Sequence, residues 1–226
     1  KGRVAKFVSY DSRLGHLTTR CVGSHRYEVE ARTVGGHSWG AFGNPNAIAV
    51  LSRVVGEIYR IEVPHIGDSR TTYNVGIIEG GTSVNTIAQS AKMLCEYRSD
   101  TLECLAIMKE KFERIFAEVG ASDGVELSVT LVGERPCMGD VDLNAIERMA
   151  QICGEIQMRV TGKEQIFYGA ASTDCNIPLS LGIPAICVGV YEGGGAHTRE
   201  EWVKRDSMIP GLAAGIETVL ALTEEV

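Results

Sequence analysis

The glycine-rich run from 35 to 48, GGHSWGAFGNPNAI, constrains the fold more than any other stretch of the sequence. Four glycines and one proline in this run exclude a regular strand or helix, so the sequence predicts a loop with special backbone angles. Asn44 is suited to cap a following helix, and Pro45 fits the first helical position, where no amide donor is needed. The run is therefore predicted to join a strand to a helix.

The middle of this loop contains a histidine, a serine and two aromatic residues: His37, Ser38, Trp39 and Phe42. One interpretation is a plain strand-to-helix turn whose aromatic side chains are tucked beneath it. The other is that His37 is presented to a ligand or to a partner subunit. The loop by itself leaves both interpretations open.

The segments around the loop alternate between two kinds of apolar pattern. Period-two alternation predicts strands, and apolar residues at three- and four-residue steps predict helices, the second of which Asp100 is expected to cap. In chain order these are strand 26–34, helix 45–60, strand 71–79, strand 91–99, helix 102–119 and strand 125–132. This β-α-β-β-α-β order predicts a ferredoxin-like fold, with two helices on one face of a four-stranded antiparallel sheet.

From Gly139 onward the pattern is typical of an α/β layer domain. A nearly all-apolar segment, 184–190, predicts a buried strand of the parallel kind. The other predicted elements are a strand over 6–10 before a polar turn, a helix around 143–153, a strand over 165–168, a helix near 175–181 that follows a loop, and a helix over 207–223. The apolar side of that last helix is predicted to comprise Ile209, Leu212, Ile216, Val219 and Leu220. The predicted domains are α/β parts at 1–22 and 134–226, and a ferredoxin-like part at 23–133.

Composition excludes several classes of protein. The net charge is -7 and no Lys/Arg run occurs, which argues against nucleic acid as the main partner. No apolar run reaches membrane-spanning length. The seven cysteines form no C-x-x-C pair, which indicates reduced thiols and a cytoplasmic location. The chain begins without a methionine, and we expect it to be a fragment.

His197 is the strongest single candidate for chemistry. It follows three glycines at the carboxyl end of a buried strand, where open α/β sheets bind their ligands. Glu200 and Glu201 lie close enough in sequence to orient its imidazole. The alternative is a surface histidine on a flexible loop. Asp11, at the end of the first predicted strand, is either a turn former or a second site residue.

Four motifs in this order resemble those of one known family: GGHSWGAFGNPNAI, VGIIEGGTSVNTIAQSAKMLCEYRSD, AASTDCNIPLSLGIPAICVGV and GGGAHTREEWV. The family comprises the dinuclear zinc peptidases and deacylases related to peptidase T, carboxypeptidase G and acetylornithine deacetylase. The resemblance extends from about residue 6 to the carboxyl terminus. It implies a partial parallel-sheet zinc-peptidase catalytic domain around a ferredoxin-like dimerisation domain.

The resemblance also implies roles for individual residues. His197 matches a zinc ligand, and Asp11 matches the acidic ligand of the other zinc, although the family usually has Asp-Gly or Glu there and this chain has Asp11-Ser12. His37 matches a histidine that crosses a dimer to polarise the scissile carbonyl and stabilise the oxyanion.

Further residues match positions that bind substrate. Asn85 and Arg98 match substrate-binding residues of the insert domain, and Arg98 suits a terminal carboxylate. Its alternative role is that of a surface charge at the end of a strand. Pocket-lining roles are implied for Ser172, Thr173, Asp174 and Gly194, and simple helix capping is an equal alternative for Asp174.

The family's H-x-D motif, bridging Asp and Glu-Glu pair are all missing from this sequence. Because a catalytic zinc needs three protein ligands, one ligand per metal should not retain either of the two zinc ions of the intact enzyme. The general base is missing too.

The sequence therefore predicts the carboxy-terminal part of a peptidase T-like aminopeptidase. Such an enzyme would act as a homodimer on short peptides through metal-activated water, and this chain alone is predicted to be inactive. The alternatives are a deacylase of N-acyl amino acids and a non-catalytic dimerisation module. Apolar surface left without a partner should make the chain self-associate.

Overall fold

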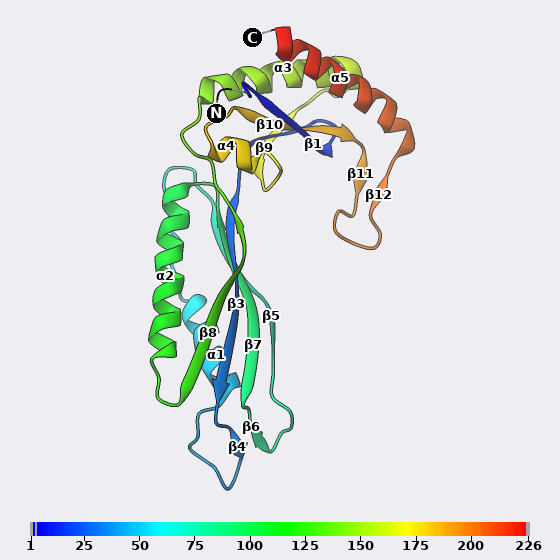
Figure 1. Cartoon of the computed structure of the whole chain (residues 1–226). Helices are drawn as coiled ribbons and strands as arrows, with labels where there is room; N and C mark the ends of the chain where they lie inside the picture. Colours follow the sequence, from blue (N-terminus) through cyan, green and yellow to red (C-terminus); the bar gives the residue numbers. More distant parts are fainter. Residues whose placement is uncertain (1, 3, 225–226) are drawn as a thin grey trace. The chain divides into compact units, whose positions relative to one another are not determined.

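The protein is described by a computed structural model, which covers residues 2 and 4–224 (Figure 1). The chain divides into two compact units: Gly23–Arg135 forms one, and Lys1–Val22 together with Pro136–Val226 forms the other. We call the first the ferredoxin-like unit and the second the α/β unit. The chain thus passes between the units at 22/23 and 135/136, where the sequence predicted boundaries at 22/23 and 133/134.

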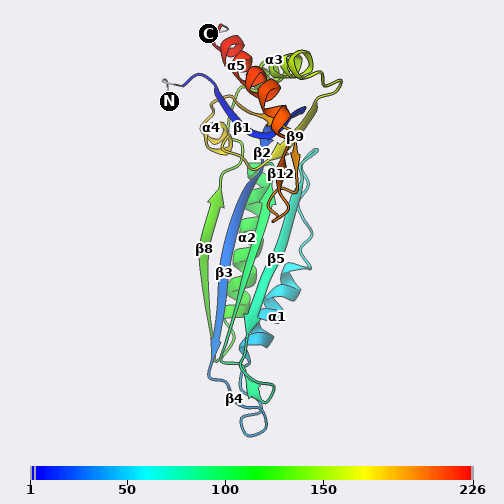
Figure 2. The same ribbon diagram turned by 90° about the vertical axis from the view of Figure 1, so that its right-hand side faces the viewer.

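The ferredoxin-like unit has the predicted β-α-β-β-α-β order. Its strands are β3 (Gly23–Thr33), β5 (Thr71–Gly80), β7 (Ser90–Ser99) and β8 (Val125–Arg135), and its helices are α1 (Ala47–Ile58) and α2 (Leu102–Gly120). The sheet order is β5-β7-β3-β8, and every neighbouring pair is antiparallel. Both helices pack on one face of this sheet (Figure 2). The predicted fold is confirmed, and a small hairpin of β4 (Gly36–His37) and β6 (Thr86–Ile87) is added to it.

The core of this unit follows from the period of its strands. Every second residue of β3 and β7 faces the helices, which buries Tyr27, Val29 and Tyr97 among others. Tyr97 is fully buried and packs on Phe112 of α2 with ring centroids 4.8 Å apart. Its hydroxyl lies 2.5 Å from Nδ1 of His25, so this buried polar group has a partner.

Both helix starts differ from the predictions. Asn46 caps α1, because its side-chain oxygen accepts the N–H groups of Ile48 and Ala49. The Asn44 amide instead donates to the Gly35 carbonyl at 2.7 Å and so closes the loop. Thr101 caps α2, whereas the carboxylate of Asp100 accepts the backbone N–H of Arg70.

The α/β unit has a four-stranded sheet in the order β1-β10-β2-β9. The strands are β1 (Phe7–Arg13), β2 (His16–Cys21), β9 (Phe167–Ala171) and β10 (Ala185–Tyr191), and the helices are α3 (Leu143–Thr161), α4 (Asn176–Ser180) and α5 (Met208–Glu224). A hairpin of β11 (Gly193–Gly194) and β12 (Trp202–Val203) and a 3-10 turn, η1 (Arg205–Ser207), lie between β10 and α5. β1 pairs with β10 and β2 with β9 in parallel, as expected for this part, but β10 and β2 are antiparallel. β2 was missed, because its polar sequence HLTTRC gives no strand pattern of its own.

The apolar side predicted for α5 is not the side that the helix buries. The side that carries Ile209, Leu212 and Ile216 is exposed, with 80% of Ile209 accessible. The buried side carries small residues, among them Gly211 and Gly215. The helix approaches β10 so closely that only small side chains fit between them.

This exposed side of α5 leads to a prediction about self-association. Replacing Leu212 and Ile216 together by Gln should lower the average mass of the chain in solution, because it removes apolar surface that water disfavours. Static light scattering over a concentration series measures that mass. Glu103→Gln with Glu110→Gln on α2 is the control, since both positions are exposed and polar. Equal scattering by the Leu212/Ile216 variant and the parent chain would contradict the prediction.

Among the described residues, no helix combines the length and apolarity needed to cross a bilayer.

Candidate functional site

The hairpin at the end of the ferredoxin-like unit brings two predicted site residues together. β4 and β6 pair His37 with Thr86, and the N–H of Ser38 donates to the carbonyl of Asn85 at 3.0 Å. Figure 1 shows this hairpin at the end of the unit far from the ends of β3 and β8 where the chain enters and leaves it. His37 and Asn85 therefore lie beside each other on this hairpin.

Hydrogen bonds within the loop set the tautomer of His37. Its Nδ1 accepts the backbone N–H groups of Trp39 and Gly40, at 3.3 and 3.4 Å. A ring nitrogen that accepts carries no proton, so in the neutral imidazole the proton is on Nε2. The imidazole is exposed, and in this tautomer its Nε2–H is available to donate to an oxygen atom.

Two glycine φ angles and a hydrogen bond to the carbonyl of His37 determine the backbone shape of this loop. Gly35 and Gly36 have φ angles of 63° and 135°, which a residue with a side chain rarely adopts. A Cβ on Gly36 would lie 2.6 Å from the Cβ of Ala41, and the N–H of Ala41 donates to the carbonyl of His37. The glycines are therefore required for the shape of the loop.

The interpretation that the aromatic side chains are tucked beneath the loop was wrong. Trp39 is 89% exposed and Phe42 is 91% exposed. Both rings thus extend from the loop on which the imidazole stands.

Arg98 is not brought to this site within one chain. It lies near the other end of β7, eight residues after Ser90, which corresponds to about 27 Å along a strand. Its guanidinium already binds both carboxylate oxygens of Glu96, at 2.7 and 3.0 Å. Burial raises the pKa of Glu96, but Arg98 and Arg26 outweigh burial and hold that pKa below its ordinary value. A substrate carboxylate would have to compete with Glu96 for Arg98.

Asp11 lies inside a strand and not at its end, because β1 continues to Arg13. The pairing register shifts around it: Ser9 pairs with Cys187 and Ser12 with Gly189, so β1 bulges at Asp11. Bulges are frequent beside active sites, where they redirect a side chain. Asp11 is exposed at this bulge.

The carboxylates of Asp11 and Asp174 both influence one buried thiol, that of Cys187 in β10. Burial raises the pKa of this thiol, and the charges of both carboxylates act in the same direction. Asp174 does not cap α4, which begins at Asn176 without a side-chain cap.

The turn before α4 is held by a residue that the sequence analysis missed. Asn176 is fully buried, and its side-chain oxygen accepts the N–H of Thr173 at 2.8 Å. Its amide donates to the carbonyls of Val22 and Pro136, each at 2.9 Å. These contacts fix Thr173 and brace the two points at which the chain leaves and re-enters the α/β unit.

His197 lies in the hairpin of β11 and β12 with a φ of 65°, the only positive φ among the non-glycine residues that the structure describes. The N–H and the hydroxyl of Thr198 both donate to the carbonyl of Gly195, which closes a tight turn around His197. Such a conformation costs of order 1–3 kcal/mol and is concentrated at functional sites. Glu200 contributes its backbone N–H to this turn, which it donates to Thr198. The turn supports the interpretation of His197 as a site residue.

The base of this hairpin is held by Glu192, a second residue that sequence reasoning missed. Its carboxylate accepts hydrogen bonds from the ammonium groups of Lys163 and Lys204, at 2.9 and 3.2 Å. The same two lysines hold the pKa of Glu192 below its ordinary value. The N–H of Glu192 donates to Ser207, so side-chain and backbone contacts anchor the hairpin next to Gly194.

No complete metal site is found among the described residues. Within residues 2 and 4–224, no group of three or more His, Cys, Asp or Glu side chains is arranged to hold a metal ion. A catalytic zinc has three protein ligands, a number that Asp11 and His197 alone do not reach.

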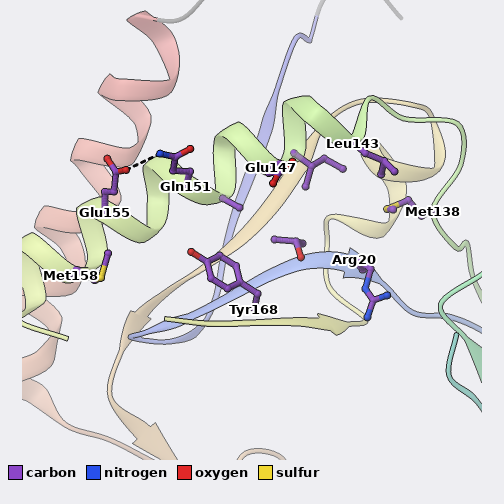
Figure 3. A pocket seen from close by; sticks show the side chains of 11 residues that line it. Arg20, Met138, Leu143, Glu147, Gln151, Glu155, Met158 and Tyr168 are labelled. Atoms are coloured by element: carbon purple, nitrogen blue, oxygen red, sulfur yellow. Dashed lines mark hydrogen bonds between the residues drawn. The ribbon is translucent and has the colours of Figure 1, made fainter. Parts of the chain in front are cut away.

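One hollow of the α/β unit contains none of the predicted site residues. It has a volume of about 700 Å³ and lies between α3 and strands β2 and β9, with Arg20, Glu147 and Tyr168 in its wall (Figure 3). A second, almost wholly apolar hollow of about 480 Å³ lies beside Tyr10 and Leu212. The two hollows adjoin β9 and β1, the two edge strands of the sheet. The two hollows therefore lie beside the unpaired edges of this sheet, and additional polypeptide could cover those edges.

Comparison with known proteins identifies the ferredoxin-like unit. The family model described as "Peptidase dimerisation domain" matches residues 21–124. The uncharacterised protein YqjE of Bacillus subtilis is 26% identical over 185 residues, which cover 80% of this chain and 45% of YqjE. Succinyl-diaminopimelate desuccinylase of Corynebacterium glutamicum is 25% identical over 195 residues, or 83% of this chain and 49% of that enzyme.

A solved structure shows the same fold over almost the whole chain. The crystal structure of a tripeptidase from Staphylococcus aureus superposes with a TM-score of 0.71 at 19% identity, over 93% of this chain and 55% of the tripeptidase. The chain spans about half the length of the curated relatives that it matches. The resemblance drawn from the four sequence motifs is confirmed.

Proposed function

We propose, from the premise that residues 21–124 belong to the peptidase dimerisation domain family, that this chain is the carboxy-terminal part of a homodimeric, metal-dependent amide hydrolase. The intact enzyme would be a cytoplasmic, peptidase T-like aminopeptidase that cleaves short peptides. The observation that carries the proposal is the His37 loop. A dimerisation domain that ends in an exposed, neutral imidazole with its Nε2 proton free is suited to act on a substrate bound by another subunit.

The separation of residues within the ferredoxin-like unit supports action across a dimer. His37 and Asn85 lie at the β4–β6 hairpin, and Arg98 lies about 27 Å along β7 from the first residue of that strand, Ser90. Side chains so far apart cannot grip one short substrate from the same chain. In a two-fold dimer, the His37 loop of one chain can serve a substrate held by the other chain.

In this proposal the chain's own residues polarise the carbonyl and bind the substrate. His37 donates Nε2–H to the carbonyl oxygen, and Asn85 adds a polar contact beside it. Ser172, Thr173, Asp174 and Gly194 line the substrate pocket of the complete enzyme, and Arg98 holds a substrate carboxylate once Glu96 releases it. Asp11 and His197 complete a metal site whose remaining ligands come from outside this chain.

It follows that the isolated chain retains neither of the two zinc ions and is inactive. A catalytic zinc needs more protein ligands than Asp11 and His197 provide. The general base that the family uses is missing from the sequence as well.

Two other candidates are supported by particular findings. The relative that is a desuccinylase favours deacylation of an N-acyl amino acid within the same reaction class. A non-catalytic role as a dimerisation module is favoured by the donor set, because the described residues contain no cluster that could hold a metal.

The test measures amide hydrolysis by the complete enzyme, with zinc and with all metal ligands present. Di- and tripeptides, N-succinyl amino acids and N-acetyl amino acids form the substrate panel. We expect hydrolysis by the complete enzyme and none by residues 1–226 alone. A zinc titration of residues 1–226 should show no tight binding, and two tightly bound ions would contradict our count of ligands. If the complete enzyme cleaves no amide, the module interpretation replaces the proposal.

A further inference from the structure

Three apolar side chains surround His37 and are almost completely exposed. Trp39 is 89% exposed and Phe42 is 91% exposed, and both stand on the His37 loop. Val84, on the adjoining loop between β5 and β6, is fully exposed. Single exposed apolar residues are normal on protein surfaces, but a cluster of large ones marks a surface that becomes covered.

The loop does not allow these rings to fold back. The backbone N–H of Trp39 is engaged by Nδ1 of His37, and the Asn44 amide ties the end of the loop to the Gly35 carbonyl. The backbone hydrogen bonds of the loop are thus satisfied internally. Its side chains are presented outward in a fixed arrangement, which lowers the entropic cost of binding.

The rings and the imidazole must reach the same place. The N–H of Trp39 bonds to the ring of His37, and the N–H of Ala41, the residue before Phe42, bonds to its carbonyl, so the backbone that carries both aromatic residues is tied to His37. A substrate whose carbonyl oxygen meets Nε2, as proposed above, therefore comes within reach of the same loop. The covered surface is therefore the substrate-bearing surface of the second copy.

We propose that Trp39 and Phe42 determine substrate specificity as an apolar wall that one chain supplies to the substrate bound by a second copy of this chain. The proposal rests on the function proposed above. It names the substrate class: amides whose side chain beside the scissile carbonyl is aromatic or large and aliphatic. An apolar wall favours such groups over hydrogen or a charged group, which would lose its hydration against the rings.

The first experiment measures the solvent accessibility of Trp39 and does not depend on enzyme activity. Residues 1–226 contain two tryptophans, so Trp202→Phe, together with Phe at any tryptophan of the complete enzyme outside this chain, leaves Trp39 as the only one. We expect its emission to shift to shorter wavelength, and acrylamide quenching to fall, as concentration drives the complete enzyme from monomer to dimer. N-acetyl-phenylalanine should protect Trp39 further, and N-acetyl-glycine should not. If Trp39 stays fully quenchable in the dimer with N-acetyl-phenylalanine, the proposal is wrong.

The second experiment compares kcat/KM of the complete enzyme for amides of phenylalanine and of glycine. Trp39→Ala and Phe42→Ala should each lower the phenylalanine value by roughly 10- to 100-fold and change the glycine value by less than about threefold, since one side of the pocket is lost. Val34→Ala, which is apolar and 66% exposed but precedes the loop, is the control and should change neither.

The outcomes separate this inference from the proposed function. If the parent enzyme hydrolyses both amides and the variants lose both equally, the wall is not a specificity device, although the enzyme proposal stands. If the parent enzyme hydrolyses neither amide, the enzyme proposal fails, and the quenching of Trp39 still decides whether a second copy covers the rings.

Discussion

Mixing two inactive variants of the complete enzyme, His37→Ala and His197→Asn, is expected to restore about a quarter of the parent activity if the protein is a two-fold dimer. Random exchange makes about half of the dimers mixed, by the same symmetry. Each mixed dimer contains one site with both histidines and one site with neither. The recovery arises only if His37 of one chain serves the site that contains His197 of the other.

Each variant alone is expected to be severely impaired. Loss of an oxyanion donor such as the Nε2–H of His37 should lower kcat by about 10²–10³. His197→Asn removes the imidazole, and Asn tolerates the φ of 65° found at this position, so the turn should persist. Any loss of activity then reports on the imidazole and not on the backbone.

His65→Ala is the matched control, because His65 is an exposed histidine of the same unit outside the loop. It should keep parent activity and add nothing when mixed with either variant. Steady-state hydrolysis of a tripeptide, before and after subunit exchange, is the measurement. Failure of the mixture to recover, with dimer exchange verified by light scattering of size-tagged chains, would show that His37 does not act across the dimer.

The second large effect concerns the packing of α5 on β10. Gly211→Ala should destabilise the α/β unit by about 3 kcal/mol or more, because well-packed contacts cannot absorb an added methyl group without displacement of the backbone. A Cβ at Gly211 would lie 1.7 Å from the carbonyl oxygen of Val190. Either the helix shifts away from the strand or the strand distorts, and both changes expose core.

Gly215→Ala is the control in the same helix. Its Cβ would lie 3.5 Å from the nearest atom, in the ring of Tyr10, which is ordinary van der Waals contact. Because Ala favours a helix by roughly 0.5–1 kcal/mol over Gly, this variant should be neutral or slightly more stable. Urea unfolding followed by circular dichroism measures both. Equal midpoints for the two variants would mean that α5 does not approach β10 as closely as described.

Local pattern was sufficient for the ferredoxin-like unit. Apolar residues at every second position, such as Tyr27 and Val29, indicate which face of a strand is buried. The helices that cover this face come from the same stretch of chain. Gly35 and Gly36 likewise predict a loop, because few other residues adopt the φ angles found there. These features depend on neighbours within the unit, so the sequence determines them.

Local pattern failed where the deciding partner is distant in the chain. β2 becomes a strand because it pairs with β10 and β9, which lie more than a hundred residues later. Local pattern also failed over a shorter span: Asn46 rather than Asn44 caps α1, because the Asn44 amide donates to the carbonyl of Gly35 in the same loop. In each case a hydrogen bond made in three dimensions overrides a local preference of similar strength.

The amino-acid sequence by itself determined the order of the elements in the ferredoxin-like unit, the His37 loop and the resemblance to zinc peptidases, because side-chain period and backbone freedom are local properties. Only the tertiary structure decided the pairing of β2 with β9 and β10, the exposure of Trp39 and the side of α5 that is buried. These depend on which groups meet across the fold. Hydrogen bonds and close contacts between remote residues leave no periodic trace in the sequence.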